Sequence, residues 1–258
     1  METKVKAKRR NGKVLHAKIY NCYANGVKKP PIVIACHGFP GTKDEGGRFP
    51  AVARALNDVG IDFISFDFAG YGENEREPIF LSKQIENLED IVEFVKSQGY
   101  TSYGTLGLSF GGQTSLLTDL PDRKAAVFWA PAFYMSRVIG GIGKHFANFW
   151  MRVFGEPVLI GNYDYESVMI ERKFTKQMYG TPSELIDNSL AKFITPARII
   201  QGSADLVVRP WITKEAYSKM PQDDDHDLQF IKMSGHNFHG DKLAQFVELT
   251  VDWFQKYL

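Results

Sequence analysis

Residues 103–112 have the sequence YGTLGLSFGG. Tyr103–Leu108 is an apolar run that predicts a strand, and Ser109–Leu120 predicts a helix directly after it. The serine of the Gly107–Gly112 segment therefore lies at a sharp strand-to-helix turn, where glycines on either side of it allow the two segments to cross. Such a turn exposes the hydroxyl at a helix N-terminus, where developing negative charge is favoured. We expect Ser109 to be a nucleophile; the alternative is a serine that merely caps the helix.

Strands and helices alternate on both sides of this motif. The further strands that we expect are residues 32–36, 61–66, 125–129, 197–201 and 228–233. The further helices that we expect are residues 49–59, 81–98, 211–220 and 241–257. At the N-terminus, two alternating stretches, residues 4–8 and 14–20, flank Asn11-Gly12, a strong hairpin signal. This order predicts an α/β fold with a mostly parallel, doubly wound sheet and an N-terminal hairpin.

The alternation pauses at residues 131–194, which divides the predicted core into residues 1–130 and 195–258. The pause is rich in aromatic residues and glycine. We interpret it as an inserted, largely helical cap, with Phe133, Phe146 and Trp150 as candidate substrate-binding residues. The alternative is a pair of crossover helices whose aromatic residues belong to the core.

A serine nucleophile needs a base, and the base needs an orienting carboxylate. His236 follows the last predicted strand, and Asp205 follows the one before it. Because the carboxyl ends of parallel strands meet at one edge of the sheet, both side chains can reach Ser109. His239 is the nearest rival for the base. Asp205 could instead cap a turn.

A glycine-rich turn, His37-Gly38-Phe39-Pro40-Gly41, follows the strand at residues 32–36. The backbone N–H groups of Phe39 and Phe110 are candidate oxyanion-hole donors, because both follow strands at the same sheet edge. Phe39 is also a candidate substrate-binding residue. For His37 itself we expect a role in shaping the loop.

Together these motifs resemble the α/β-hydrolase superfamily over nearly the whole chain, and most of all compact esterases of the cinnamoyl/feruloyl type and serine aminopeptidase-like hydrolases. The resemblance implies that Ser109, Asp205 and His236 form a catalytic triad. Residues 66–72, FDFAGYG, are similar to a structural turn of that family, which makes Asp67 structural. Leu108 departs from the polar residue that many relatives have before the serine, which should alter packing but not the triad.

The composition fits a globular protein: 44% of the residues are hydrophobic, 24% are charged and the net charge is +1. No basic face indicates a nucleic-acid partner, and no apolar run is long enough for a membrane helix. The basic N-terminus lacks the apolar stretch of a secretion signal, so we expect a cytoplasmic protein. The sequence is compatible with a homodimer. We expect neither a cofactor nor a metal.

The sequence thus predicts a serine carboxylesterase acting on a small-molecule ester, with an apolar or aromatic group preferred under the cap. A thioesterase, a carbon–carbon bond hydrolase and an aminopeptidase use the same triad. An aminopeptidase is expected to have carboxylates in the cap that bind the substrate's amine. Four acidic residues of the predicted cap keep this alternative open: Glu156, Asp164, Glu166 and Glu171. A non-catalytic ligand-binding protein is the alternative from another class.

Overall fold

The computed structural model describes residues 1–22, 29–138, 152–153, 157–162 and 165–258. Within these residues, eight strands form one sheet in the order β1-β2-β4-β3-β5-β6-β9-β10. Their bounds are β1 Glu2–Lys8, β2 Val14–Tyr20, β3 Ile32–Cys36, β4 Asp62–Phe66, β5 Tyr103–Leu108, β6 Ala125–Trp129, β9 Ala197–Gly202 and β10 His226–Ile231. The β1–β2 and β2–β4 pairs are antiparallel, and the pairs from β4 to β10 are parallel. The predicted mostly parallel sheet with an N-terminal hairpin is confirmed.

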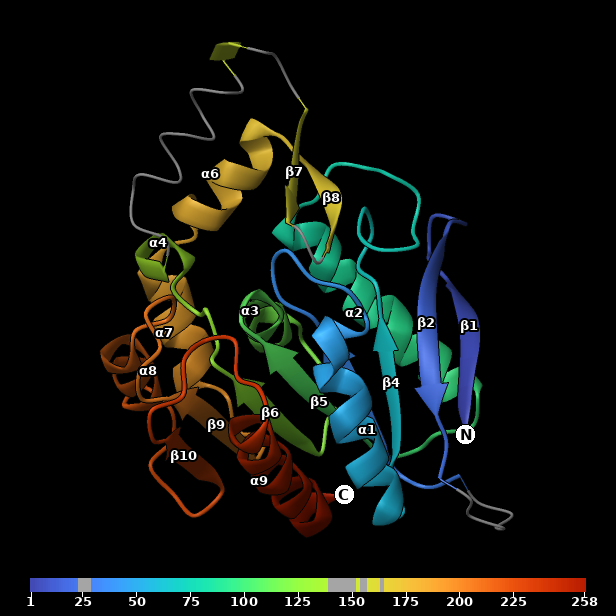
Figure 1. Ribbon diagram of the computed structural model, residues 1–258, viewed down its shortest axis with the longest axis vertical. Helices are drawn as coiled ribbons and strands as arrows, with labels where there is room; N and C mark the ends of the chain where they lie inside the picture. Colours follow the sequence, from blue (N-terminus) through green and yellow to red (C-terminus); the bar gives the residue numbers. More distant parts are fainter. Residues whose placement is uncertain (23–28, 139–151, 154–156, 163–164) are drawn as a thin grey trace.

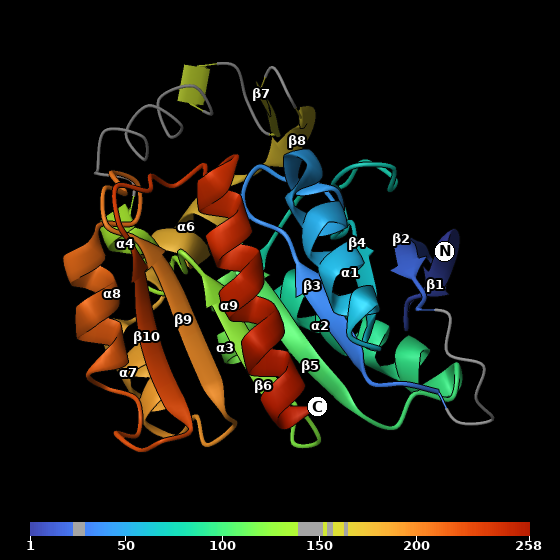
Figure 2. The same cartoon turned by 60° about the horizontal axis from the view of Figure 1, so that its bottom comes forward.

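Helices cover both faces of the sheet (Figures 1 and 2). One face carries α1 Arg48–Asp58 and α9 Asp241–Tyr257, which pack against each other. The other face carries α2 Leu81–Ser97, α3 Phe110–Leu117, α7 Ser183–Ala191 and α8 Pro210–Tyr217. The strands between them are apolar on both sides, and β3, β4, β5 and β6 are buried at every residue, as expected for a sheet enclosed by two helical layers.

Each face of the sheet has its own core. Beneath α1 and α9, the largest buried side chains include Phe49, Trp129, Phe246 and Phe254. On the other face, buried side chains from α2, α3, α7 and α8 contact the sheet. The two cores hold the strands in register, so the loops at their carboxyl ends have fixed starting points.

The segment predicted as a largely helical cap also contains a pair of strands that the sequence did not lead us to expect. Its described part contains α4 Met135–Val138, the antiparallel pair β7 Val158–Asn162 and β8 Tyr165–Ile170, and α6 Arg172–Gly180. These elements lie beyond the carboxyl ends of the central strands (Figure 1). β-branched residues in the short apolar runs 158–160 and 168–170 favour strands in this segment. The helix α7 instead buries Ile186 and Leu190 against α3 and the sheet, as a core helix does. The division into core and cap stays a prediction.

In the described part of the chain, no helix combines the length and the apolar character needed to cross a membrane.

Gly104 tests how tightly the last helix packs on the sheet. A Cβ atom at this position in β5 would lie 2.6 Å from the Phe254 ring and 3.1 Å from the Ala125 carbonyl oxygen. Phe254 is fully buried, and side chains in a close-packed core cannot move far without strain. We therefore expect Gly104→Ala to lower the free energy of unfolding by about 1–3 kcal/mol, measured by urea denaturation. The matched control is Gly180→Ala, because nothing lies within 4 Å of a Cβ there. Equal stability of the two variants would contradict the packing.

Candidate active site

Ser109 lies on a strained turn between β5 and α3. Its backbone angles are φ 51° and ψ −114°, a conformation that residues other than glycine rarely adopt. A Cβ atom at Gly111 would lie 2.2 Å from the carbonyl oxygen of Cys36, and one at Gly107 would lie 2.7 Å from the Gly112 Cα. The glycines are therefore needed because backbone packs directly on backbone. This is the geometry that the sequence motif predicts.

His236 and Asp205 lie beside Ser109, although the three residues come from widely separated parts of the chain. His236 Nε2 lies 3.2 Å from Ser109 Oγ, and His236 Nδ1 lies 2.8 Å from Asp205 Oδ2. The Asp205 side chain is fully buried, and that of His236 is 16% exposed. The structure thus brings the three predicted residues into one hydrogen-bonded series at the carboxyl ends of β5, β9 and β10.

The buried Asp205 carboxylate has further hydrogen-bond donors. The backbone N–H groups of Val207 and Val208 donate to Oδ1 at 2.8 and 2.9 Å. Gln201 Nε2 donates to Oδ2 at 3.0 Å, and Gln201 Oε1 accepts from the Thr213 hydroxyl. These bonds compensate the cost of burying the charge and fix the carboxylate toward His236. Sequence reasoning did not identify Gln201, although its place at the end of β9, four residues before Asp205, was a usable signal.

His37 shapes the turn after β3, as predicted. Its Nε2 accepts a hydrogen bond from the Phe68 N–H at 3.0 Å, so the proton is on Nδ1, which donates to the Gly38 carbonyl oxygen at 2.9 Å. Burial lowers the pKa of this imidazole, which favours the neutral form that these two bonds require. In a trans peptide the N–H points opposite to the C=O, so the Phe39 N–H points away from His37.

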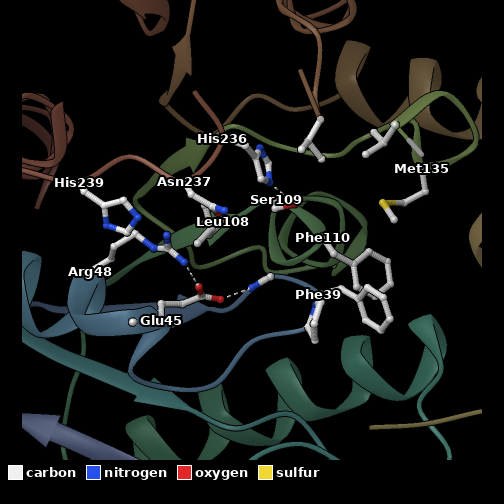
Figure 3. A pocket seen from close by; sticks show the side chains of 15 residues that line it. Phe39, Glu45, Arg48, Leu108, Ser109, Phe110, Met135, His236, Asn237 and His239 are labelled. Atoms are coloured by element: carbon white, nitrogen blue, oxygen red, sulfur yellow. Dashed lines mark hydrogen bonds and ion pairs between the residues drawn. The ribbon is translucent and has the colours of Figure 1, made fainter. Parts of the chain in front are cut away.

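A cavity of about 540 Å³ opens at Ser109 (Figure 3). On one side of Ser109 and His236 lie Phe39, Phe110 and Met135, and on the other side lie polar side chains. The polar residues of the lining include Glu45, Arg48, Asn237 and His239. The apolar side continues into Phe174, whose ring centroid is 5.3 Å from that of Phe39 and 6.1 Å from that of Phe110. The cavity therefore has one apolar and one polar side.

Neither the Phe39 nor the Phe110 amide donates a hydrogen bond to another group among the described residues. Phe110 is the first residue of α3, where the amide has no acceptor within the helix. Both residues line the cavity beside Ser109. Their role as oxyanion donors stays a prediction, with two unengaged amides at the right place to support it.

The candidate substrate-binding residues separate into three groups. Phe39 lines the cavity as predicted. Phe133 does not, because it lies in the core, 1% exposed, with its ring 5.1 Å from that of Phe128. It belongs to the core cluster that also contains Phe128, as the alternative of core aromatic residues predicts. Phe146 and Trp150 lie outside the described residues.

Among the other histidines, His239 lines the cavity but forms no part of the series at Ser109. Its carbonyl oxygen accepts from amides in the first turn of α9. His226 pairs with Asp223 at 2.6 Å, but His226 begins β10 and therefore lies at the opposite edge of the sheet from Ser109. An aspartate–histidine pair alone therefore does not locate the site.

Glu45 and Arg48 are two charged cavity residues that sequence reasoning missed. Both are buried, and they form an ion pair at 2.7 Å. Their signal was an acidic and a basic residue separated by two glycines, beginning four residues after the end of the predicted oxyanion turn.

Chemically, the series can deprotonate a serine hydroxyl and stabilise the resulting imidazolium. The unengaged amides can hold an oxyanion that develops on a carbonyl attacked by Ser109. No cluster of three or more histidine, cysteine or acidic side chains that could hold a metal occurs in the part of the chain that the structure describes.

Comparison with known sequences places these features in a family context. A family model described as serine aminopeptidase, S33, matches residues 28–243. A carboxylesterase from Bacillus subtilis (strain 168) is 25% identical over 238 residues, which cover 88% of this chain and 92% of that protein. An uncharacterized 31.7 kDa protein from Escherichia coli is 32% identical over 89 residues, 33% of this chain, and the match spans 30% of that protein's length.

Solved structures show the same fold. Est1E from Butyrivibrio proteoclasticus with bound ferulic acid superposes with a TM-score of 0.79 at 19% identity, and 98% of each chain is covered. A monoacylglycerol lipase from Paleococcus ferrophilus gives a TM-score of 0.72 at 17% identity, with 93% of this chain and 97% of that chain covered. At these identities the likeness establishes the α/β-hydrolase fold alone.

Asp205→Asn tests whether Asp205 keeps the proton of the neutral His236 imidazole on Nδ1. A carboxylate accepts on both oxygens, whereas a carboxamide accepts on one. If the carboxamide oxygen of this variant keeps the Val207 and Val208 amides, its NH₂ group faces His236 Nδ1 and favours the wrong imidazole tautomer. We expect kcat for ester hydrolysis to fall roughly 10⁴-fold, as a wrong tautomer causes in serine-protease triads.

The matched control for this prediction is Asp223→Asn, which alters the aspartate–histidine pair at the opposite sheet edge. It should leave kcat unchanged. Similar losses in the two variants, or full activity of Asp205→Asn, would contradict the assignment of the acid.

Proposed function

Because the chain belongs to the serine aminopeptidase S33 family of α/β-hydrolases, we propose that it is a serine hydrolase that cleaves carboxylic esters through an acyl-enzyme. The observation that carries the proposal is the Ser109–His236–Asp205 series at 3.2 and 2.8 Å, open to a cavity with two unengaged amides beside it. The carboxylesterase of Bacillus subtilis supports the choice of an ester bond.

In the proposed mechanism, His236 Nε2 accepts the proton of the Ser109 hydroxyl as Oγ attacks the ester carbonyl carbon. Asp205 stabilises the imidazolium that forms, and the Phe39 and Phe110 amides stabilise the oxyanion. His236 then donates the proton to the alcohol oxygen as the carbon–oxygen bond breaks. A water molecule, deprotonated by the same imidazole, then attacks the acyl carbon. The bond between this carbon and Ser109 Oγ breaks, and His236 returns the proton to Oγ as the acid leaves.

The lining of the cavity favours an uncharged acyl group. We place the acyl group against Phe39, Phe110 and Met135, because burying apolar surface there is favourable and burying an unpaired charge is costly. The leaving alcohol then lies on the side of His236, since this imidazole must reach the alcohol oxygen to protonate it.

An aminopeptidase is the second candidate, because the family description names one. That activity needs a carboxylate free to bind the substrate's amine. Glu45 lines the cavity, but its two oxygens already accept from the Gly38 N–H and from Arg48. Glu171 is described and does not line the cavity. Glu156 and Asp164 lie outside the described residues, as does the side chain of Glu166. A carboxylic ester is therefore the first choice.

Ser109→Ala tests the proposal. We expect the wild-type protein to react with a fluorophosphonate probe and to hydrolyse p-nitrophenyl esters. In the variant, labelling should vanish and kcat should fall roughly 10⁶-fold, because no other group supplies the nucleophile. A series of acyl lengths, with methyl ferulate and an aminoacyl-nitroanilide, measures which bond and which acyl group are preferred.

Ser97→Ala, which removes an exposed hydroxyl at the end of α2, is the matched control and should behave as wild type. Faster turnover of the anilide than of every ester would favour the aminopeptidase. A wild-type protein that neither binds the probe covalently nor turns over any substrate would overturn the proposal in favour of a ligand-binding protein.

A further inference from the structure

The buried carboxylate of Glu45 is hydrogen-bonded to the loop after β3, which contains the proposed oxyanion donor Phe39. This loop, His37–Gly41, is called the oxyanion loop below. Glu45 Oε1 accepts a hydrogen bond from the Gly38 N–H at 2.6 Å, and Glu45 Oε2 accepts from Arg48 Nη2 at 2.7 Å. The two side chains are 3% and 6% exposed. A carboxylate buried to this degree needs such partners, and it fixes their positions in return.

The oxyanion loop is closed tightly around this carboxylate. A Cβ atom at Gly41 would lie 2.4 Å from Glu45 Oε1 and 2.9 Å from the Gly38 carbonyl oxygen. A Cβ atom at Gly38 would lie 3.3 Å from the Cβ of Ser109, so this part of the loop also contacts the nucleophile. A displacement of the Glu45 carboxylate is therefore transmitted to the peptide groups beside Ser109.

The backbone at Glu45 is strained. Its φ is 45°, and the two glycines that follow have φ values of 58° and 87°. A left-handed conformation at a residue with a side chain is strained and persists where surrounding interactions demand it. Here it turns the chain so that α1 starts at Arg48 while the Glu45 side chain points back to Gly38 (Figure 3).

The His37 imidazole and the Glu45 carboxylate together fix the orientation of the peptide group that contains the Phe39 N–H. The His37 imidazole holds the Gly38 carbonyl oxygen, and Glu45 holds the Gly38 N–H on the preceding peptide. With both peptide planes held, the direction of the Phe39 N–H is determined before any substrate arrives. Preorganised donors of this kind are worth more than donors that must reorient during the reaction.

We propose that Glu45, itself held by Arg48, is a positioning residue that aligns the oxyanion loop for the transition state. The inference rests on the proposed function, because it assigns Glu45 a role in stabilising an oxyanion formed at Ser109. Glu45 does not exchange a proton with the substrate. Its effect therefore falls on kcat and on the binding of tetrahedral anions, and much less on the binding of uncharged ground states.

Glu45→Gln is the informative variant. The carboxamide has one accepting oxygen, for which the Gly38 N–H and Arg48 compete, so its NH₂ group faces a donor in either orientation. We expect kcat for a p-nitrophenyl ester to fall about 10–100-fold with KM changed less than threefold, as for a slightly misplaced oxyanion donor. Affinity for a phenylboronic acid, which forms a tetrahedral anion on serine, should fall by a similar factor.

A second variant tests the competition directly. In Glu45→Gln/Arg48→Met the rival donor is absent, so the oxygen of the introduced carboxamide is available to the Gly38 N–H. We expect kcat and boronic acid affinity to recover toward wild type, and the melting temperature, lowered in the single variant by the unpaired Arg48 charge, to recover in part. A purely structural role for the ion pair predicts instead that both variants keep wild-type kcat and boronic acid affinity at a temperature where they are folded, whatever their melting temperatures.

Glu77→Gln is the matched control, because Glu77 is a largely buried carboxylate that pairs with Arg9 and Lys83 in another part of the molecule. It should lower the melting temperature and leave kcat and boronic acid affinity unchanged. Glu45→Gln with wild-type kcat and boronic acid affinity would overturn the inference while leaving the esterase proposal intact. A wild-type protein inert toward esters, fluorophosphonate and boronic acid would overturn both.

Discussion

The first turn of α3 packs against the end of β3 so closely that Gly111 has no space for a side chain. The Cys36 carbonyl oxygen would lie 2.2 Å from a Cβ atom there, and the His37 carbonyl oxygen would lie 2.5 Å away. This backbone contact forces Ser109 into its strained conformation and places the loop after β3 directly beside it. Contact between the main chains of α3 and β3 is therefore enough to make Ser109 and the proposed oxyanion loop neighbours.

The positions of Asp205 and His236 depend on the register of the sheet. Since β5, β6, β9 and β10 are parallel and in register, their carboxyl ends meet at one edge, and the loops after β9 and β10 start at fixed distances from Ser109. Buried hydrophobic clusters on both faces of the sheet keep these strands from shifting. A rigid sheet with short loops can hold His236 at 3.2 Å from Ser109 over a separation of 127 residues in the chain.

Sequence reasoning succeeded where a single local rule decides the structure. Buried parallel strands are apolar runs, and the strands Tyr103–Leu108 and Ala125–Trp129 have the predicted bounds. It failed where a side chain's environment depends on distant elements. Phe133 follows a strand at the site edge, and nothing local distinguishes a cavity aromatic residue from one that packs on Phe128. Glu45 and Gln201 lie close in the sequence to predicted site residues, but both were missed because a buried polar residue is recognised by its hydrogen-bond partners, which the fold supplies. The strands in residues 158–170 were missed because the aromatic composition of the segment was taken as the signal of a helical cap and its short β-branched runs were overlooked.

Two buried carboxylates serve the site in the same physical way. Asp205 accepts from two backbone amides and from Gln201 while it faces His236, and Glu45 accepts from one backbone amide while it faces Arg48. An ionised carboxylate is expensive to bury, and that cost is offset when each oxygen has a donor at short distance. The same requirement makes the loop conformations specific, because a displaced loop would leave a buried charge without its donors. Because the buried charges need their donors, the loops at the edge of the sheet are held in one conformation. Less reorganisation then remains for the moment when an oxyanion forms.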